Sequence, residues 1–378
     1  MGRDLEDRIR ARIAGRSLRI DASGIRKVFD LAASLRDPVD LSIGRPQHDV
    51  PDAVKESAVR AIRSGKNRYT PTQGHPDLVD ALTERIGRTV PTDGKKLLVT
   101  CGVSGGLFLA FATLIDPGDE VIMGDPYFVI YKQVVTFLGG VPVPVDTYPD
   151  FRFTAERIEP LVSDRTKIII VGSPCNPTGA VSTARELQEI AELAQRHDLL
   201  VISDEIYSTF SYDGPAPSIV PMHEEILLLS GFSKSHAATG WRIGYAFGPA
   251  PLIDEMAKLQ QYSFVCAPAP AQAAILENLD LDTTPITDAY RRKRDTVCQG
   301  LAGTYDLVRP GGAFYVFPKT PWGTDVEFVE EAVRNNLLII PGSIFSGRTT
   351  HFRISYAADD QTLRRGIDIL TRVADRPA

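Results

Sequence analysis

The stretch 226–248, ILLLSGFSKSHAATGWRIGYAFG, decides how the rest of the chain is interpreted. It opens with four apolar residues, the length of a buried strand, breaks into a small polar turn, and closes on a second apolar run. The turn presents Lys234, and Arg242 follows it. An ammonium group is costly to bury, and burial lowers its pKa. A lysine with a lowered pKa is what Schiff-base chemistry needs, whereas a lysine that extends from a loop to solvent is the alternative.

The composition is that of an ordinary globular protein. The chain has 378 residues, 43% hydrophobic and 24% charged, with a net charge of -6 and no long basic run, so nucleic acid is not an expected partner. This length favours one large domain plus a smaller one. No apolar run reaches the ~18 residues that span a bilayer, and the N-terminus has no signal-peptide core, so no membrane association is expected. The cysteines lack metal-site spacing, so we expect a cytoplasmic protein with reduced thiols and no metal site: Cys101, Cys175, Cys266 and Cys298.

A second motif couples a strand to the start of a helix. Residues 96–100 are an apolar strand, and the small residues CGVSGG (101–106) lead into the helical run LFLAFATLI. Free N–H groups and the positive end of the helix dipole make such a turn an anion site. It has neither the GxGxxG spacing of a dinucleotide site nor the lysine of a P-loop, so neither a dinucleotide nor ATP is indicated. A plain strand-to-helix connection is the alternative.

Two further predicted strands end in polar residues. KIIIVG (167–172) runs into SPCNPTG (173–179), and LLVIS (199–203) ends at Asp204, with Tyr207 close behind. A carboxylate at the end of a buried strand has a raised pKa unless it is paired, although a helix N-cap is the alternative for Asp204. Because Lys234 ends the next strand, both side chains are expected in one crevice at the carboxyl edge of the sheet.

Taken in order, these motifs resemble those of the class I aminotransferases, which are fold type I pyridoxal-phosphate enzymes. The resemblance runs from about residue 23 to near the C-terminus and includes LSIGRP (41–46), NRYTPTQG (67–74), DPYF (125–128), DEIY (204–207) and HFRISY (351–356). It implies an α/β protein whose large domain, residues 45–275, holds a mostly parallel seven-stranded sheet. A smaller α+β domain would combine residues 1–44, which include an N-terminal arm, with residues 276–378.

The same resemblance implies pyridoxal 5′-phosphate as the cofactor. Lys234 matches the lysine that holds it as an internal aldimine, and Asp204 matches the carboxylate that keeps the ring nitrogen protonated, so that the ring is an electron sink. Tyr207 would hydrogen-bond the ring oxygen and complete the catalytic set. The other implied cofactor contacts are Tyr69, Gly102, Val103, Ser104, Phe128, Asn176, Ser233 and Arg242.

Substrate contacts are implied at Gly44, Asn176 and Arg353. The planar fork of Arg353 suits a bidentate bond to the substrate α-carboxylate, whereas without the resemblance an exposed strand arginine is equally expected. The acidic residue that follows the glycine in the family is Arg45 here, which leaves the chemistry of the entrance open. Tyr69 would reach the partner's cofactor phosphate in a homodimer, or it is simply a surface tyrosine.

The implied reaction is transamination, with Lys234 as general base and acid and with ping-pong kinetics. The motifs SGIRKVFDLA (23–32), SGFSK (230–234) and GGAFYVFP (311–318) resemble archaeal-type aromatic and aspartate aminotransferases, which favours an aromatic or broad-range L-amino acid donor and 2-oxoglutarate as acceptor. A C–S β-lyase with the same cofactor is an alternative. A regulatory pyridoxal-binding protein is another alternative. Two features argue against it: Lys234, Asp204 and Arg353 are intact, and the segment before the helix expected near residue 23 is short.

Overall fold

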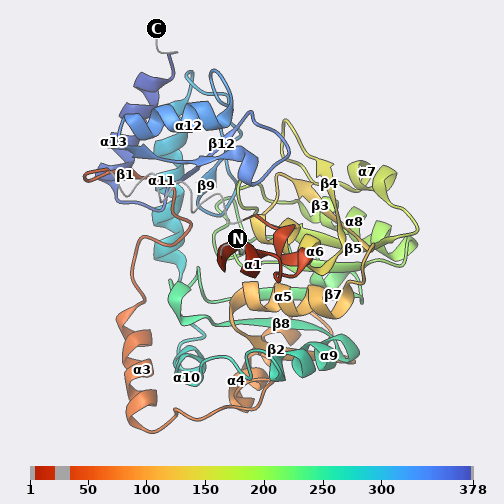
Figure 1. The fold of residues 1–378 in the computed structure, drawn as a ribbon. Helices are drawn as coiled ribbons and strands as arrows, with labels where there is room; N and C mark the ends of the chain where they lie inside the picture. The colour runs from red at the N-terminus through yellow and green to blue at the C-terminus, as the bar shows by residue number, and fades with distance from the viewer. Residues whose placement is uncertain (1–4, 22–34, 376–378) are drawn as a thin grey trace.

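A seven-stranded sheet forms the centre of the larger part of the molecule (Figure 1). The computed structural model describes residues 5–21 and 35–375. The strand order is β2 (Lys95–Thr100), β8 (Gly244–Pro249), β7 (Ile226–Gly231), β6 (Leu200–Asp204), β5 (Thr166–Gly172), β3 (Glu120–Asp125) and β4 (Val141–Asp146). Only β8 runs antiparallel to its neighbours, which confirms the predicted mostly parallel sheet.

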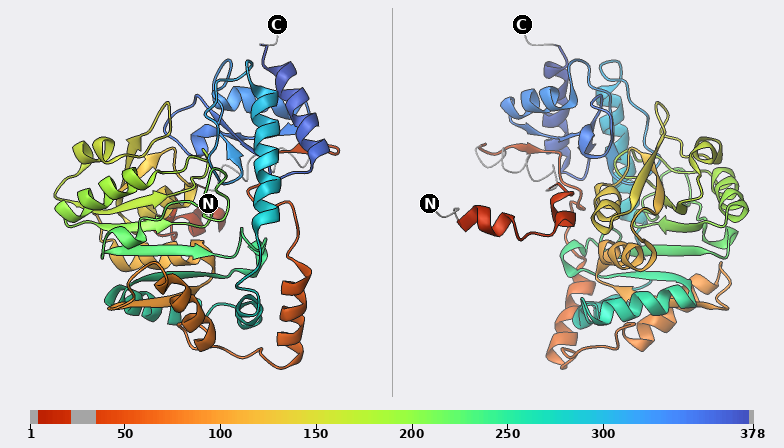
Figure 2. Two further views of the ribbon diagram at one scale, coloured as in Figure 1. Left: turned by 180° about the vertical axis from the view of Figure 1, so that it is seen from behind. Right: turned by 45° about the vertical axis from the view of Figure 1, so that its right-hand side comes forward.

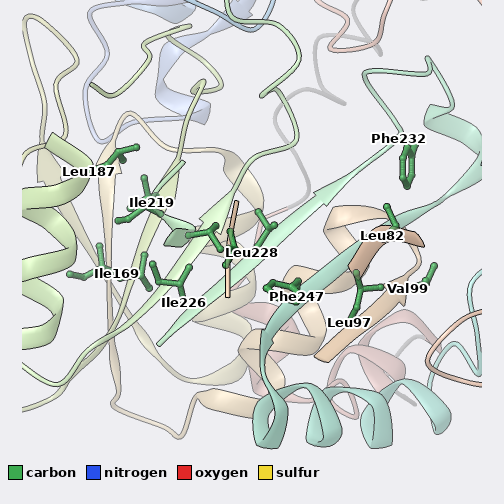
Figure 3. Packing of buried hydrophobic residues seen from close by; sticks show 14 of the residues in the cluster. Leu82, Leu97, Val99, Ile169, Leu187, Ile219, Ile226, Leu228, Phe232 and Phe247 are labelled. Atoms are coloured by element: carbon green, nitrogen blue, oxygen red, sulfur yellow. The ribbon is translucent and has the colours of Figure 1, made fainter. Parts of the chain in front are cut away.

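Helices cover both faces of this sheet, which is why its central strands are apolar on both sides. Leu227 and Leu229 of β7 pack on the side of α5 (Gly102–Leu114), α6 (Val129–Leu138) and α9 (Ala250–Gln261). Ile226 and Leu228 face the other core, shown in Figure 3. That core is closed by α3 (Asp52–Arg63), α4 (Pro76–Gly87), α8 (Ala184–Arg196) and α10 (Ala269–Leu276). The short helix α7 (Ala155–Ile158) buries Ile158 in the same core.

A smaller α+β unit combines the two ends of the chain. Its three-stranded antiparallel sheet has the order β11 (Ile340–Pro341), β12 (Phe352–Ser355), β9 (Tyr315–Val316). Early in the chain, β1 (Val39–Asp40) pairs in parallel with β10 (Leu337–Leu338), beside α11 (Thr284–Leu301), α12 (Asp325–Arg334) and α13 (Asp360–Val373) (Figure 1). These elements share a buried core, into which Tyr207, Phe210 and Tyr212 from the segment after β6 also pack.

The first segment projects from the rest of the molecule. Helix α1 (Leu5–Arg10) buries none of its side chains and stands away from the body in the right-hand view of Figure 2. The helix expected within residues 23–35 lies mostly outside the described residues. None of the helices in residues 5–21 and 35–375 has both the length and the apolarity of a membrane crossing.

Two short strands lie in or beside motifs quoted above. The strand Val39–Asp40 precedes LSIGRP, and Asp40 accepts hydrogen bonds from the backbone and side chain of Ser42, which turns the chain there. The carbonyl of Ser42 is then free to bind an arginine rather than a neighbouring strand. In the segment 311–318, only Tyr315–Val316 is a strand.

Candidate active site

A cavity of about 420 Å³ lies at the carboxyl edge of the large sheet and is closed from the other side by β9 and β12. The ends of β5 and β6, the β7–β8 connection and the start of α5 all contribute to its wall. The structure brings most of the predicted site residues to this one cavity: Gly44, Val103, Ser104, Phe128, Asn176, Asp204, Tyr207, Ser233, Lys234, Arg242 and Arg353. Gly102 and Tyr69 do not line it.

Lys234 follows the end of β7 and points its amine into the cavity. The Nζ atom donates a hydrogen bond to the carbonyl of Gly44 at 2.6 Å and lies 5.4 Å from the centre of the Tyr207 ring. Burial and the nearby charges of Arg353 and Arg242 lower the pKa of this amine to about 8. A larger fraction of Lys234 is therefore an uncharged nucleophile at neutral pH than is the case for an ordinary lysine.

Asp204 ends β6 and is 4% exposed. Its carboxylate accepts hydrogen bonds from the Tyr131 hydroxyl at 2.7 Å and from the Ile206 N–H at 3.2 Å. Burial raises the pKa of Asp204, while these two hydrogen bonds and the charge of Lys234 oppose the shift. A buried carboxylate held in this way is suited to pair with a cationic N–H group.

The start of α5 and Arg242 form an anion cradle. The guanidinium of Arg242 donates to the carbonyls of Thr239 (2.9 Å) and Cys101 (3.2 Å), immediately before the helix. A Cβ atom added to Gly102, which has a φ of 71°, would lie 2.4 Å from this guanidinium. Only glycine therefore lets the arginine approach the N–H groups at the helix start, which explains Gly102 even though it does not line the cavity.

Arg353 on β12 is 2% exposed and forms no salt bridge with the described residues. Its guanidinium donates to Asn176 Oδ1 at 3.0 Å and to the carbonyl of Ser42 at 2.7 Å, and its Nε has no hydrogen-bond partner. A buried guanidinium is stable only when a negative group compensates it. The space beside Arg353 is therefore suited to a carboxylate group.

These groups fit pyridoxal 5′-phosphate: an amine for its aldehyde, a carboxylate for its ring nitrogen and a cradle for its phosphate. The Phe128 side chain lines the wall and supplies an aromatic surface against which a flat ring can pack. In the described ranges, the side chains that commonly bind metals never gather in threes.

Comparison with known proteins decides the family. Residues 36–370 match the sequence model of the family described as aminotransferase class I and II. The chain belongs to this family. This aminotransferase is 38% identical over 366 residues to a putative aminotransferase of Bacillus subtilis, covering 92% of this chain and 94% of that protein. It is 37% identical over 390 residues to the aspartate/prephenate aminotransferase of Thermus thermophilus, covering 99% and 100% of the two chains.

Solved structures of aminotransferases have the same fold as this chain. The aspartate aminotransferase of Thermus thermophilus with maleate has a TM-score of 0.91 at 37% identity, covering 96% of this chain and 99% of that one. The aromatic aminotransferase of Pyrococcus horikoshii has a TM-score of 0.84 at 33% identity, covering 92% and 98%. The fold is that of the fold type I enzymes, and members of this family use pyridoxal phosphate. The enzyme is a pyridoxal-phosphate-dependent aminotransferase whose substrates are amino acids and 2-oxo acids.

Two predicted positions of the aminotransferase lie at the edge of the site or outside it. Arg45 is exposed and lines the cavity, so the departure from the family motif sits at its mouth. Tyr69 is 81% exposed and has no role in the cavity of its own chain. Arg152, a cavity arginine that the sequence did not single out, is held by Glu186.

Sequence reasoning also overlooked two tyrosines of the aminotransferase site. Tyr131 donates to Asp204, and the Tyr315 hydroxyl lies 2.8 Å from the Tyr207 hydroxyl. Tyr131 lies just after the DPYF motif, at the start of α6, and Tyr315 lies within GGAFYVFP, so motifs already quoted from the sequence point to both positions.

Proposed function

We propose that this enzyme moves the amino group of an aromatic or broad-range L-amino acid to a 2-oxo acid such as 2-oxoglutarate, with Lys234 as the residue that holds the cofactor between turnovers. One observation carries the proposal: an amine with a lowered pKa, a buried carboxylate and a buried arginine without an ion-pair partner line the same cavity. This combination supplies a nucleophile, a partner for a ring N–H and a carboxylate site.

The bound cofactor supplies an aldehyde that takes up an amine and a ring that accepts the electron pair left at Cα. With the cofactor bound, the Nζ of Lys234 would take the proton from the substrate Cα and deliver it to C4′ of the cofactor, acting first as general base and then as general acid. Asp204, kept ionised by Tyr131 and by a ring N–H, holds positive charge on the ring nitrogen. Tyr207 donates to the ring oxygen.

The arginine Arg353 and the amide of Asn176 bind the substrate carboxylate, with Gly44 beside them. The remaining wall is rich in apolar and aromatic side chains, which supports an aromatic or broad-range donor: Ile43, Tyr127, Phe128, Phe151, Phe153 and Val181. Relatives named for aspartate/prephenate and for aromatic amino acids support the same range. Val103 and Ser104 contact the cofactor phosphate through backbone N–H groups, and Ser233 stands beside Lys234.

We also propose a homodimer with shared active sites, in which Tyr69 reaches the partner's cofactor phosphate. Large hydrophobic side chains are exposed on the N-terminal segment and elsewhere on the surface, which supports an interface: Leu18 (63%), Ile9 (48%), Tyr262 (82%) and Tyr69 itself (81%). If sites are shared, subunit exchange between Tyr69→Ala and Lys234→Ala homodimers restores activity, because each mixed dimer has one site free of both changes.

Two organisational proposals complete this description. The large domain is residues 45–275, and the small domain is residues 1–44 with 276–378; the two cores beside the large sheet, whose buried residues all fall within 45–275, support this division. The cytoplasmic location stays a prediction.

A half-reaction screen tests the function. Purified, cofactor-loaded enzyme is mixed with single L-amino acids, and the change in the cofactor spectrum and the released product are followed. We expect aromatic donors, L-aspartate and L-glutamate to convert the cofactor and release the matching 2-oxo acid. Release of pyruvate and ammonia from sulfur-containing donors would instead indicate a C–S β-lyase, and no conversion with any donor would indicate a regulatory protein.

A further inference from the structure

Tyr315 lies where several parts of the site meet. It is on β9, where it pairs with Ser355 of β12, and it is 1% exposed. Its hydroxyl is 2.8 Å from the Tyr207 hydroxyl. A Cβ atom added to Gly44, whose carbonyl binds Lys234, would lie 2.6 Å from the same hydroxyl. One side chain thus contacts both the residue expected at the cofactor oxygen and the segment that covers the reactive amine.

The ring of Tyr315 has a second neighbour. The guanidinium carbon of Arg353 lies 4.6 Å from the centre of the Tyr315 ring, and Phe345 provides another ring at 4.7 Å. Cation–π contacts of this kind hold a guanidinium in one plane, and they need the ring rather than the hydroxyl. The hydroxyl and the ring of Tyr315 therefore have separable contacts.

The direction of the Tyr207–Tyr315 hydrogen bond follows from the proposed function. Burial raises the pKa of both phenols, so both keep their protons. If the Tyr207 proton is donated to the cofactor ring oxygen, the Tyr207 oxygen must accept from Tyr315. A hydroxyl whose oxygen accepts a hydrogen bond is a stronger donor, because the two bonds polarise each other.

We propose that Tyr315 is a positioning residue with two roles: its hydroxyl strengthens the hydrogen bond from Tyr207 to the cofactor, and its ring fixes Arg353 for the substrate carboxylate. This inference rests on the proposed function. The charged and titratable groups that face the tyrosine pair are Asp204, Lys234, Arg353 and Tyr290.

Two substitutions separate the roles. Tyr315→Phe keeps the ring and removes the hydroxyl, whereas Tyr315→Leu removes both. The first readout is a pH titration of the absorbance of the bound cofactor. The second is the concentration of L-phenylalanine or L-aspartate that gives half the maximal half-reaction rate. Tyr305→Phe is the matched control, since Tyr305 is also buried but donates to the Leu370 carbonyl at 2.7 Å, outside the cavity.

Tyr315→Phe should raise the spectroscopic pKa by about 0.2–0.5 unit, because polarisation changes the strength of the Tyr207 hydrogen bond by roughly 10–30% and does not remove it. The half-saturating donor concentration should change less than about threefold. Tyr315→Leu should raise that concentration about tenfold in addition. The Tyr305→Phe control should change neither value.

A double-mutant cycle makes the inference sharper. In a Tyr207→Phe background, Tyr315→Phe should shift the spectroscopic pKa no further, because its effect passes through Tyr207. An unchanged spectroscopic pKa in Tyr315→Phe, or equal shifts with and without Tyr207, would overturn the hydroxyl role. If Tyr315→Leu left the half-saturating donor concentration unchanged, the role of the Tyr315 ring in fixing Arg353 would be overturned. Either result leaves transamination by the wild type intact, whereas failure of the proposed function appears as a wild type without a half-reaction.

Discussion

Replacing Lys234 by methionine should stabilise the cofactor-free enzyme. The substitution keeps a flexible side chain of similar size and removes a charge that the folded cavity disfavours. Burial, Arg353 and Arg242 lower the pKa of Lys234 from 10.5 to about 8. A residue retained at a cost in stability is what a functional amine predicts.

The size of the effect follows from that shift. One pKa unit corresponds to about 1.36 kcal/mol, so holding Lys234 in the folded cavity at pH 7 costs about 3 kcal/mol relative to the unfolded chain. The lost hydrogen bond to the Gly44 carbonyl offsets about 1 kcal/mol of this. A net gain of about 2 kcal/mol remains, which corresponds to a melting temperature about 2–3 °C higher for a chain of 378 residues.

The stability gained by Lys234→Met must depend on pH. The unfolded lysine keeps its proton up to about pH 10.5, whereas the folded one loses it near pH 8, so the wild type gains stability relative to the variant as pH rises between these values. The advantage of Lys234→Met should therefore be full at pH 7, vanish at about pH 9.5 and reverse by about 1 kcal/mol at pH 10.5, where only the lost hydrogen bond to Gly44 remains.

The assay is equilibrium unfolding of both proteins without cofactor, at equal protein concentration, from pH 7 to pH 10.5. Lys96→Met is the control, because Lys96 is half exposed and pairs with Asp254 at 2.7 Å on the surface. The difference in free energy of unfolding between Lys96→Met and the wild type should not fall from pH 7 to pH 10.5. A Lys234→Met enzyme that is less stable than wild type at pH 7, or a gain independent of pH, would refute the reasoning.

Three further substitutions test the other parts of the site. Tyr131→Phe removes the 2.7 Å hydrogen bond to the buried Asp204 carboxylate, so kcat should fall about 10–100-fold with little change in KM, as steady-state kinetics would reveal. Gly102→Ala places a methyl group against Arg242 and should weaken cofactor binding at least about tenfold in equilibrium dialysis. Gly65→Ala, which shares a positive φ but meets no neighbour within 4 Å, should bind the cofactor normally. Arg353→Gln should raise KM for amino and oxo acids about hundredfold, whereas a substrate amine without a carboxylate should react at the wild-type rate.

The sequence predicts the central strands of the large sheet because they are apolar runs that end in polar turns, whereas the edge strand β4, VPVPVD, is mostly not buried and is not predicted. The same turns carry Lys234, Asp204 and Asn176, so the chemistry of the site could be located before the structure was known. The boundaries of the short strands near Leu41 and Tyr315 could not, since side-chain hydrogen bonds and tertiary pairing determine them.

The supporting tyrosines are hidden from the sequence for a physical reason. Tyr131 and Asp204 are 73 residues apart, and Tyr207 and Tyr315 are 108 apart, so only the folded chain brings each pair together. A tyrosine in an apolar run has the same pattern as any core aromatic residue. The donor side-chain pocket is equally hidden, because its wall is assembled from several distant segments.

The central claim is that Lys234 is the amine that binds the cofactor. Reduction of the loaded enzyme with sodium borohydride, followed by digestion and mass mapping, tests this most directly because it fixes the cofactor to its lysine. We predict one modified peptide, with the added mass on Lys234. The same mass on a different lysine of an active enzyme would contradict the account.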